Sequence, residues 1–214
     1  MNRMDVENVK PNDIEKRSFE IITELLGDRK LDEDKDFLIK RVIHTTADFD
    51  YVDNLYFSED VMDKLMKVIS EGCYIVTDTK MAFSGINKPA LAKTGSEAFC
   101  FISDEDVAKK AKEEGLTRSA LSMKKASTLD RPVIFAIGNA PTALLEIRDM
   151  YDSGSFTPAG VIGVPVGFVN VEVSKEKIIE TDIPCIVARG RKGGSNVAAA
   201  IVNALLYKVT NRQL

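Results

Sequence analysis

Apolar residues in the first third of the chain recur every three to five positions, which is the spacing of an amphipathic helix. The spacing predicts a helix over residues 12–26 and a second helix that begins behind the acidic residues near position 36. We expect this second helix to end at or just before His44. Residues 58–60, Ser-Glu-Asp, are expected to open a third helix.

From residue 73 onward the pattern changes to short apolar runs that alternate with amphipathic helices. The runs are Cys73–Thr77, Ala98–Ile102, Val133–Ile137, Val161–Val166 and Cys185–Ala188. The helices between and after them are expected near Asp104–Glu114, Thr117–Ala126, Thr142–Tyr151, Ser174–Glu180 and Ser195–Val209. Continuous apolar strands are typical of parallel sheets, which are buried on both faces. The sequence therefore predicts a three-layer α/β/α sandwich, Rossmann-like, with a mainly parallel sheet of about five strands preceded by N-terminal helices.

Length and composition are consistent with one domain over residues 1–214, since 44% of the residues are apolar and no interdomain linker is visible. Lys and Arg number 29 and Asp and Glu 33, which gives a net charge of −4. This balance and the absence of Trp argue against a nucleic-acid partner. No segment reaches the roughly 20 apolar residues that span a bilayer, so no membrane partner is expected.

The cysteines and the N-terminal residues bear on the compartment. Cys73, Cys100 and Cys185 are far apart, each in an apolar run, and no CxxC pair is present for zinc or redox chemistry. We expect buried thiols at these positions. The segment Met1–Lys10 is polar and does not resemble a signal peptide, so we expect a cytoplasmic protein.

His44 is the only histidine in the sequence, and polar residues follow it directly. At a helix C-terminus the macrodipole favours the imidazolium form, which is a good general acid near neutral pH. On spacing alone we favour the alternative, a histidine that caps the end of the helix through hydrogen bonds. Both interpretations stay open at the level of the residues themselves.

Two strand-to-helix turns contain glycine and could bind an anion through backbone N–H groups. Gly138–Thr142 follows an apolar run, but a simple strand-to-helix connection explains its residues equally well. Ala188–Asn196 contains Arg189, Arg191 and Lys192 before a helix, and we favour an anion site there over a solvated basic turn. Neither turn has the spacing of a Walker A loop or of GxGxxG.

Other polar positions carry weaker signals. Arg118 begins a helix, where a cation is unfavourable unless an anion is near. Asp48, Asp50 and Asp53 do not form a recognisable metal-ligand pattern and are expected in a solvated acidic loop. No Ser-His-Asp or Cys-His arrangement follows from spacing alone.

Seven segments in order, from about Pro11 to about Leu206, resemble the precorrin-8X methylmutase family of cobalamin biosynthesis. These segments are residues 14–22 (IEKRSFEII), 41–48 (RVIHTTAD), 77–81 with 84–88 (TDTKM, SGINK), 117–119 (TRS), 138–144 (GNAPTAL), 163–169 (GVPVGFV) and 189–195 (RGRKGGS). Two stretches depart from the usual family pattern, Lys80–Phe83 and Phe168–Glu172. Both departures are expected to lie at the rim of the pocket.

The resemblance implies an isomerase that moves a methyl group from C-11 to C-12 of precorrin-8X or cobalt-precorrin-8, giving hydrogenobyrinate or cobyrinate. It implies that His44 is the proton donor and acceptor, that no cofactor or protein-bound metal is needed, and that the protein is a homodimer with its site near the subunit interface. It places substrate contacts at Ser18, Arg41 and Arg118. Because the substrate carries several carboxylates, which need cations and hydrogen-bond donors, we also expect substrate-binding residues at Arg17, Thr45, Asn87, Asn139, Arg189, Lys192 and Gly193.

Two other functions remain under consideration. The first is a non-catalytic tetrapyrrole-binding paralogue of the same fold. The second is a nucleotide-dependent α/β enzyme, which the missing phosphate-loop spacings disfavour.

Overall fold

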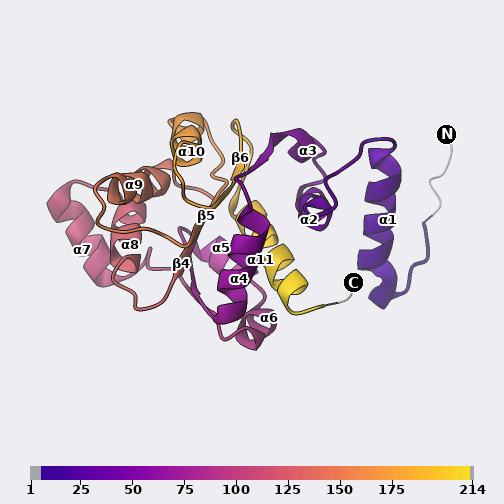
Figure 1. Ribbon diagram of the computed structural model, residues 1–214, viewed down its shortest axis with the longest axis horizontal. Helices are drawn as coiled ribbons and strands as arrows, with labels where there is room; N and C mark the ends of the chain where they lie inside the picture. Colours follow the sequence, from indigo (N-terminus) through magenta and orange to yellow (C-terminus); the bar gives the residue numbers. More distant parts are fainter. Residues whose placement is uncertain (1–5, 213–214) are drawn as a thin grey trace.

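A six-stranded sheet forms the middle layer of the computed structural model, which describes residues 6–212 (Figure 1). The first five residues of the polar segment Met1–Lys10 therefore lie outside the described chain. The strand order is β1-β6-β5-β4-β2-β3, and all neighbours pair in parallel except β1 with β6. The strands are β1 (Leu55–Phe57), β2 (Tyr74–Thr77), β3 (Glu97–Phe99), β4 (Val133–Ile137), β5 (Gly160–Gly163) and β6 (Cys185–Ala188).

The central strands are buried along their whole length, as continuous apolar runs predict. Alternate residues of one strand enter two different cores, because successive side chains point to opposite faces of a sheet. In β4, Ile134 and Ala136 join one core, whereas Val133, Phe135 and Ile137 join the other. The three-layer prediction is thus confirmed.

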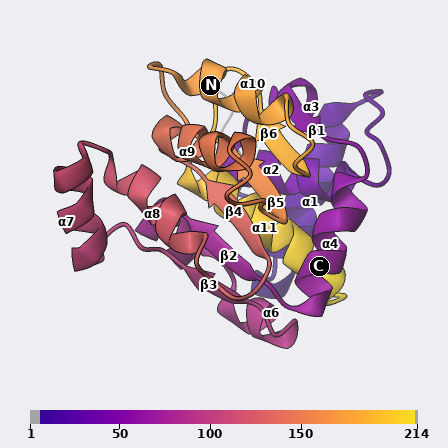
Figure 2. The ribbon, with the colours of Figure 1, turned by 60° about the vertical axis from the view of Figure 1, so that its left-hand side comes forward.

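Helices cover both faces, and Figure 2 shows α9 and α11 on opposite sides of the strands. One layer holds α1 (Ile14–Leu26), α2 (Asp36–Thr46), α4 (Val61–Glu71), α5 (Lys80–Gly85), α6 (Lys88–Lys93) and α11 (Ser195–Val209). The other holds α8 (Arg118–Ala126), α9 (Pro141–Asp152) and α10 (Val171–Ile179), with α7 (Glu105–Glu114) packed on α8. Two short helices, η1 (Pro11–Asp13) and α3 (Tyr51–Asn54), precede α1 and β1. In Figure 1, α1 and α7 lie at opposite ends of the molecule.

Several element boundaries differ from the prediction. The helix that carries His44 continues to Thr46, and it ends where Ala47 takes a left-handed conformation with φ 54°. His44 therefore lies in the last turn of α2 instead of ending it. Strand β3 lies earlier than the apolar run Ala98–Ile102 predicts, and α10 begins at Val171, three residues before Ser174.

Four elements were not predicted at all: strand β1 and the short helices α3, α5 and α6. Strand β1 has only three residues, which is too short to show a periodicity, and its pairing with β6 makes it a strand. Helices α5 and α6 have six residues each and begin behind the capping side chains of Thr79 and Asn87.

All three cysteines are free thiols. Cys73 and Cys185 are buried, and burial raises the pKa of each thiol to about 11, which makes both unreactive. Cys100 is only partly buried, because it lies beyond the end of β3. None of the helices in residues 6–212 is long and apolar enough to cross a membrane.

Candidate functional site

The loops that follow β2, β4, β5 and β6 meet at the carboxyl edge of the sheet, where ligands bind in open α/β folds. The hydroxyl oxygens of Thr79, after β2, and Ser195, at the start of α11, lie 2.7 Å apart. The backbone N–H of Gly194 donates to the carbonyl oxygen of Val164, after β5, at 2.8 Å. A Cβ on Gly138 would lie 2.6 Å from the Cα of Ser195, so only glycine allows this approach of β4 to α11.

Asp78 fills the point between β2 and β4 where the strand order reverses. Its carboxylate accepts three backbone N–H groups, those of Gly138 (2.9 Å), Asn139 (2.8 Å) and Ala140 (2.7 Å). Burial raises the pKa of the Asp78 carboxyl, although the three N–H donors act in the opposite direction.

Of the two interpretations of Gly138–Thr142, the contacts of Asp78 favour the simple strand-to-helix connection over an open anion site. The protein's own carboxylate occupies these N–H groups, so a nucleotide phosphate has no place at this helix N-terminus. This occupied helix start counts further against the nucleotide-dependent alternative.

Both arginines of the basic turn, residues 189–193, have carboxylate partners on α10. The guanidinium of Arg189 lies 3.3 Å from a carboxylate oxygen of Glu176, and that of Arg191 lies 3.1 Å from one of Glu172. These pairs are exposed, so a ligand carboxylate could exchange with them at low energetic cost.

Lys192 connects the basic turn to the loop after α2. Its Nζ lies 2.6 Å from a carboxylate oxygen of Asp48 and 2.6 Å from one of Asp50. The hydrogen bond from Lys192 lowers the pKa of Asp48, and the two acids raise the pKa of Lys192. Asp50 and Asp53 are exposed, as a solvated acidic loop predicts, and Asp48 and Asp50 are in addition the partners of a lysine.

Gly193 is required by its surroundings. Its φ is 159°, and a Cβ at this position would lie 2.1 Å from the carbonyl oxygen of Val164. The N–H of the next residue, Gly194, is already bound to that carbonyl, so it is not available to a ligand.

His44 lies in the last turn of α2 with an exposed side chain. Its ring faces the ring of Phe19 on α1, with a centroid distance of 5.4 Å and an interplanar angle of 34°. Thr45, the next residue, is also exposed. The end of α2 therefore presents an imidazole to solvent against an aromatic side chain from a different helix.

One helical turn before His44, Arg41 forms an ion pair with Glu15 of α1. Its guanidinium also lies over the rings of Phe19 (4.8 Å) and Tyr207 (5.2 Å). Burial raises the pKa of Glu15, but the hydrogen bond and the charge of Arg41 together outweigh burial. The pKa of Glu15 is therefore lowered from its ordinary value. A groove of about 840 Å³ between α1, α2 and the end of α11 opens beside this cluster and includes Arg41 in its wall.

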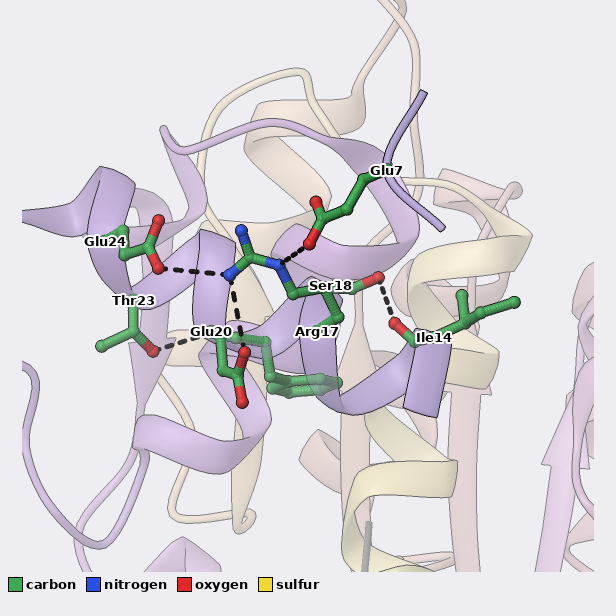
Figure 3. A network of polar contacts seen from close by, with 8 residues as sticks. Glu7, Ile14, Arg17, Ser18, Glu20, Thr23 and Glu24 are labelled. Atoms are coloured by element: carbon green, nitrogen blue, oxygen red, sulfur yellow. Dashed lines mark hydrogen bonds and ion pairs between the residues drawn. The ribbon is translucent and has the colours of Figure 1, made fainter. Parts of the chain in front are cut away.

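Arg17 and Ser18 of α1 are engaged within their own surroundings, as Figure 3 shows. The guanidinium of Arg17 contacts the carboxylates of Glu7 (2.8 Å), Glu24 (3.2 Å) and Glu20 (3.5 Å). The Ser18 hydroxyl donates to the carbonyl oxygen of Ile14 at 2.9 Å. Within residues 6–212, no hydrogen bond or ion pair joins either side chain to His44.

The remaining predicted site residues are spread over the molecule. Asn87 caps α6, and its amide donates to the Tyr207 hydroxyl at 3.0 Å, far along α11 from Ser195. Arg118 is exposed at the start of α8, in the layer opposite α2. Asn139 is exposed at the carboxyl edge and is held there through its backbone.

The sequence interpretation missed Lys175, a fully buried lysine of α10. Its Nζ donates to the carbonyl oxygens of Gly190 (2.7 Å) and Lys192 (2.8 Å), and burial lowers its pKa to about 8. The buried positions of α10 are Val171, Ser174, Lys175 and Ile178. Their spacing places the lysine on the apolar stripe of the helix, which is the signal that could have identified it.

The two departures from the family pattern both place apolar side chains on the surface. Phe168 and Val169, between β5 and α10, are 82% and 79% exposed, and Met81 on α5 is 71% exposed. The Phe168 ring lies 5.7 Å from the guanidinium carbon of Arg191, at the basic turn. Within residues 6–212, no group of three or more His, Cys, Asp or Glu side chains is arranged to hold a metal ion.

The comparisons with known proteins agree with one another. The sequence profile of the precorrin-8X methylmutase family matches residues 13–208. The chain is 46% identical over 204 residues to the cobalt-precorrin-8 methylmutase of Salmonella typhimurium, covering 92% of this chain and 95% of the relative. It is 43% identical over 197 residues to that of Priestia megaterium, covering 92% and 88%.

A solved structure shares the fold. The precorrin-8X methyl mutase of Thermus thermophilus superposes with a TM-score of 0.85 at 32% identity, covering 94% of this chain and all of that one. The chain therefore belongs to the precorrin-8X methylmutase family, whose members are isomerases that catalyse a methyl migration in cobalamin biosynthesis.

Proposed function

We propose that this chain moves the methyl group from C-11 to C-12 of precorrin-8X or cobalt-precorrin-8, with His44 as the proton donor and acceptor. The relatives named for this reaction cover nearly the whole chain, which supports the reaction type. The products of the two substrates are hydrogenobyrinate and cobyrinate.

The observation that carries the proposal is the position of His44. An exposed imidazole at the end of α2 can reach a ligand without first breaking a contact with a carboxylate, since its described neighbour is the ring of Phe19. A general acid needs access to its substrate, and the exposed side chain of His44 supports this role.

A methyl migration within one macrocycle creates and consumes no net proton. In the proposed reaction, His44 enters as imidazolium and protonates the macrocycle, which assists the migration. The neutral imidazole then takes the proton back as the conjugated product forms. The protein's other tasks are to hold the ring in one conformation and to keep water away from it.

The substrate carries several acetate and propionate carboxylates, so its site needs cations on a net-acidic protein. In the proposed complex, those cations come from among Arg17, Arg41, Arg118, Arg189, Arg191 and Lys192. Most of these are paired with carboxylates of the protein. Binding would therefore exchange one carboxylate for another, and each exposed exchange costs little.

We also propose an oligomeric state and a compartment for this protein. The protein acts as a homodimer with its site near the subunit interface, and sedimentation velocity measures its mass. It acts in the cytoplasm, which the three free thiols support, because disulfides are rare there.

An absorbance titration with hydrogenobyrinate and with cobyrinate tests the site. We expect a stoichiometric spectral shift with at least one of them, and the tighter ligand identifies the pathway branch. If neither ligand shifts the spectrum at high protein concentration, the proposed function is wrong.

Turnover of the wild-type protein and of His44→Ala then tests the role of the imidazole. We expect kcat to fall by about a hundredfold or more, the contribution typical of a general acid, with the Kd for hydrogenobyrinate unchanged. Wild-type turnover by His44→Ala would refute the catalytic assignment. Ligand binding by a wild-type protein that does not turn over would favour a non-catalytic tetrapyrrole binder.

A further inference from the structure

Among residues 6–212, the buried ammonium group of Lys175 donates hydrogen bonds to a single segment, the basic turn at residues 189–193. It binds the carbonyl oxygens of Gly190 and Lys192, two residues apart. The carbonyl oxygen between them, that of Arg191, accepts the N–H of Gly167 at 3.1 Å. Three consecutive carbonyl groups of the turn are thus bound by donors of the protein.

These contacts determine where the neighbouring N–H groups point. The described residues contain no cis peptide bond, and in a trans peptide the carbonyl and the following N–H point in opposite directions. The N–H groups of Arg191 and Gly193 therefore point away from the buried ammonium. Neither of them has a hydrogen-bond acceptor among residues 6–212.

Helix α10 holds the same turn through its side chains as well. Glu172 and Glu176 flank Lys175 on the helix, three residues before it and one after it, and they pair with Arg191 and Arg189. Burial, the larger effect, lowers the pKa of Lys175, whereas the charges of these two acids raise it. The turn is therefore attached to α10 at its backbone and at both arginines, and α10 packs beside β6 in Figure 1.

A buried lysine is unfavourable unless its hydrogen bonds are made. If position 175 only packed α10 against the rest of the protein, leucine or methionine would be sufficient. What lysine adds is a set of donors aimed at the carbonyls of a loop that contains three cations and two outward N–H groups. Outward N–H groups on a glycine-containing turn are a common way to bind a carboxylate.

We propose that Lys175 is a positioning residue, which turns the peptide groups of residues 189–193 so that the N–H groups of Arg191 and Gly193 bind a carboxylate of the substrate. The identity of that carboxylate, an acetate or propionate of the tetrapyrrole, rests on the proposed function. The orientation of the turn does not rest on it.

Amide hydrogen exchange of the full chain tests the orientation without any ligand. The reporters are the N–H groups of Arg189 and Gly194, which bind the carbonyls of Asn54 and Val164 at 2.8 Å each. In Lys175→Met we expect both to exchange about tenfold faster than in the wild-type protein, since the turn between them is released. The matched control is Lys177→Met, an exposed lysine of the same helix, for which we expect wild-type exchange.

Binding of hydrogenobyrinate tests the carboxylate site. We expect a Kd about tenfold higher for Lys175→Met, equal to ~1.4 kcal/mol, and a rise in KM that exceeds any fall in kcat. A purely structural lysine would lower the melting temperature and leave Kd unchanged, which would overturn the proposal. Wild-type exchange at Arg189 and Gly194 in Lys175→Met would overturn it as well.

A second variant and a measurement that needs no ligand complete the experiment. If Lys175→Met does not fold, Lys175→Gln replaces it, because its amide keeps N–H donors on a side chain one bond shorter, and the same direction is expected. If the wild-type protein binds no hydrogenobyrinate, the proposed function fails. The exchange comparison still decides whether Lys175 orients the turn.

Discussion

The ammonium group of Lys192 lies 2.6 Å from a carboxylate oxygen of Asp48, although 144 residues separate the two in the sequence. Asp48 follows the last residue of α2 by two positions, and α2 carries His44. Lys192 belongs to the turn that Lys175 holds from the other side. The pair therefore links the proposed proton donor to the proposed carboxylate site through a single contact.

We expect Lys192→Met to be less stable than the wild-type protein at pH 7, with a difference that shrinks as the pH falls below the folded pKa of Asp48. The hydrogen bond from Lys192 lowers the pKa of Asp48 in the folded state. A lowered carboxyl pKa stabilises the fold above the unfolded value of about 4, and this contribution is lost as the pH falls through the folded value.

Urea unfolding of both proteins at pH 7 and at about pH 2, below the lowered pKa of Asp48, measures the difference. Lys110→Met, an exposed lysine of α7, is the control and should match the wild-type protein at both values. A gap between wild type and Lys192→Met that is as large in acid as at pH 7 would contradict the pairing.

We expect Asp78→Asn to lower the free energy of unfolding by roughly 2–4 kcal/mol, because one amide oxygen cannot replace a carboxylate that accepts three buried N–H groups. Urea denaturation measures this, and Asp182→Asn, at an exposed position, should have no effect. If the two variants were equally stable, Asp78 would not hold the start of α9.

We expect Gly193→Ala to cost about 2 kcal/mol or more, since the added Cβ would meet the Val164 carbonyl oxygen at 2.1 Å. Gly190→Ala is the control within the same turn. Its Cβ would meet nothing within 4 Å, and only its φ of 72° opposes the change, at about 1 kcal/mol. Thermal melts of both variants decide the order, and the reverse order would contradict the close approach of β5 and the basic turn.

The alternation of apolar runs and amphipathic helices was sufficient to predict the layers and the strands at the centre of the sheet. Burial on both faces leaves a continuous apolar run in the sequence, and such a run is visible without a structure. Strand β1, at one edge of the sheet, was harder to predict from the sequence. Strand β1 is defined by its pairing with β6, and a partner 130 or so residues away leaves no local pattern.

Only some residues of the candidate site could be predicted from the sequence. A histidine at the end of a helix and a basic turn before another helix are local signals, and both were found. For Gly138–Thr142, the sequence was compatible both with an open anion site and with a simple strand-to-helix connection. Glycine and proline occur at a helix start whether or not a carboxylate of the protein binds its N–H groups. The side chain that binds them, Asp78, comes from a different strand.

What the sequence alone determined is therefore the class of fold and the family, because periodicity and motif order are properties of neighbours along the chain. What only the tertiary structure decided is which polar groups are already satisfied. Asp78 with the start of α9, Lys192 with Asp48, and Lys175 with the carbonyls of the basic turn are contacts between distant segments. Charge and hydrogen bonding act through space, so the availability of a group to a ligand depends on its partners in the folded chain.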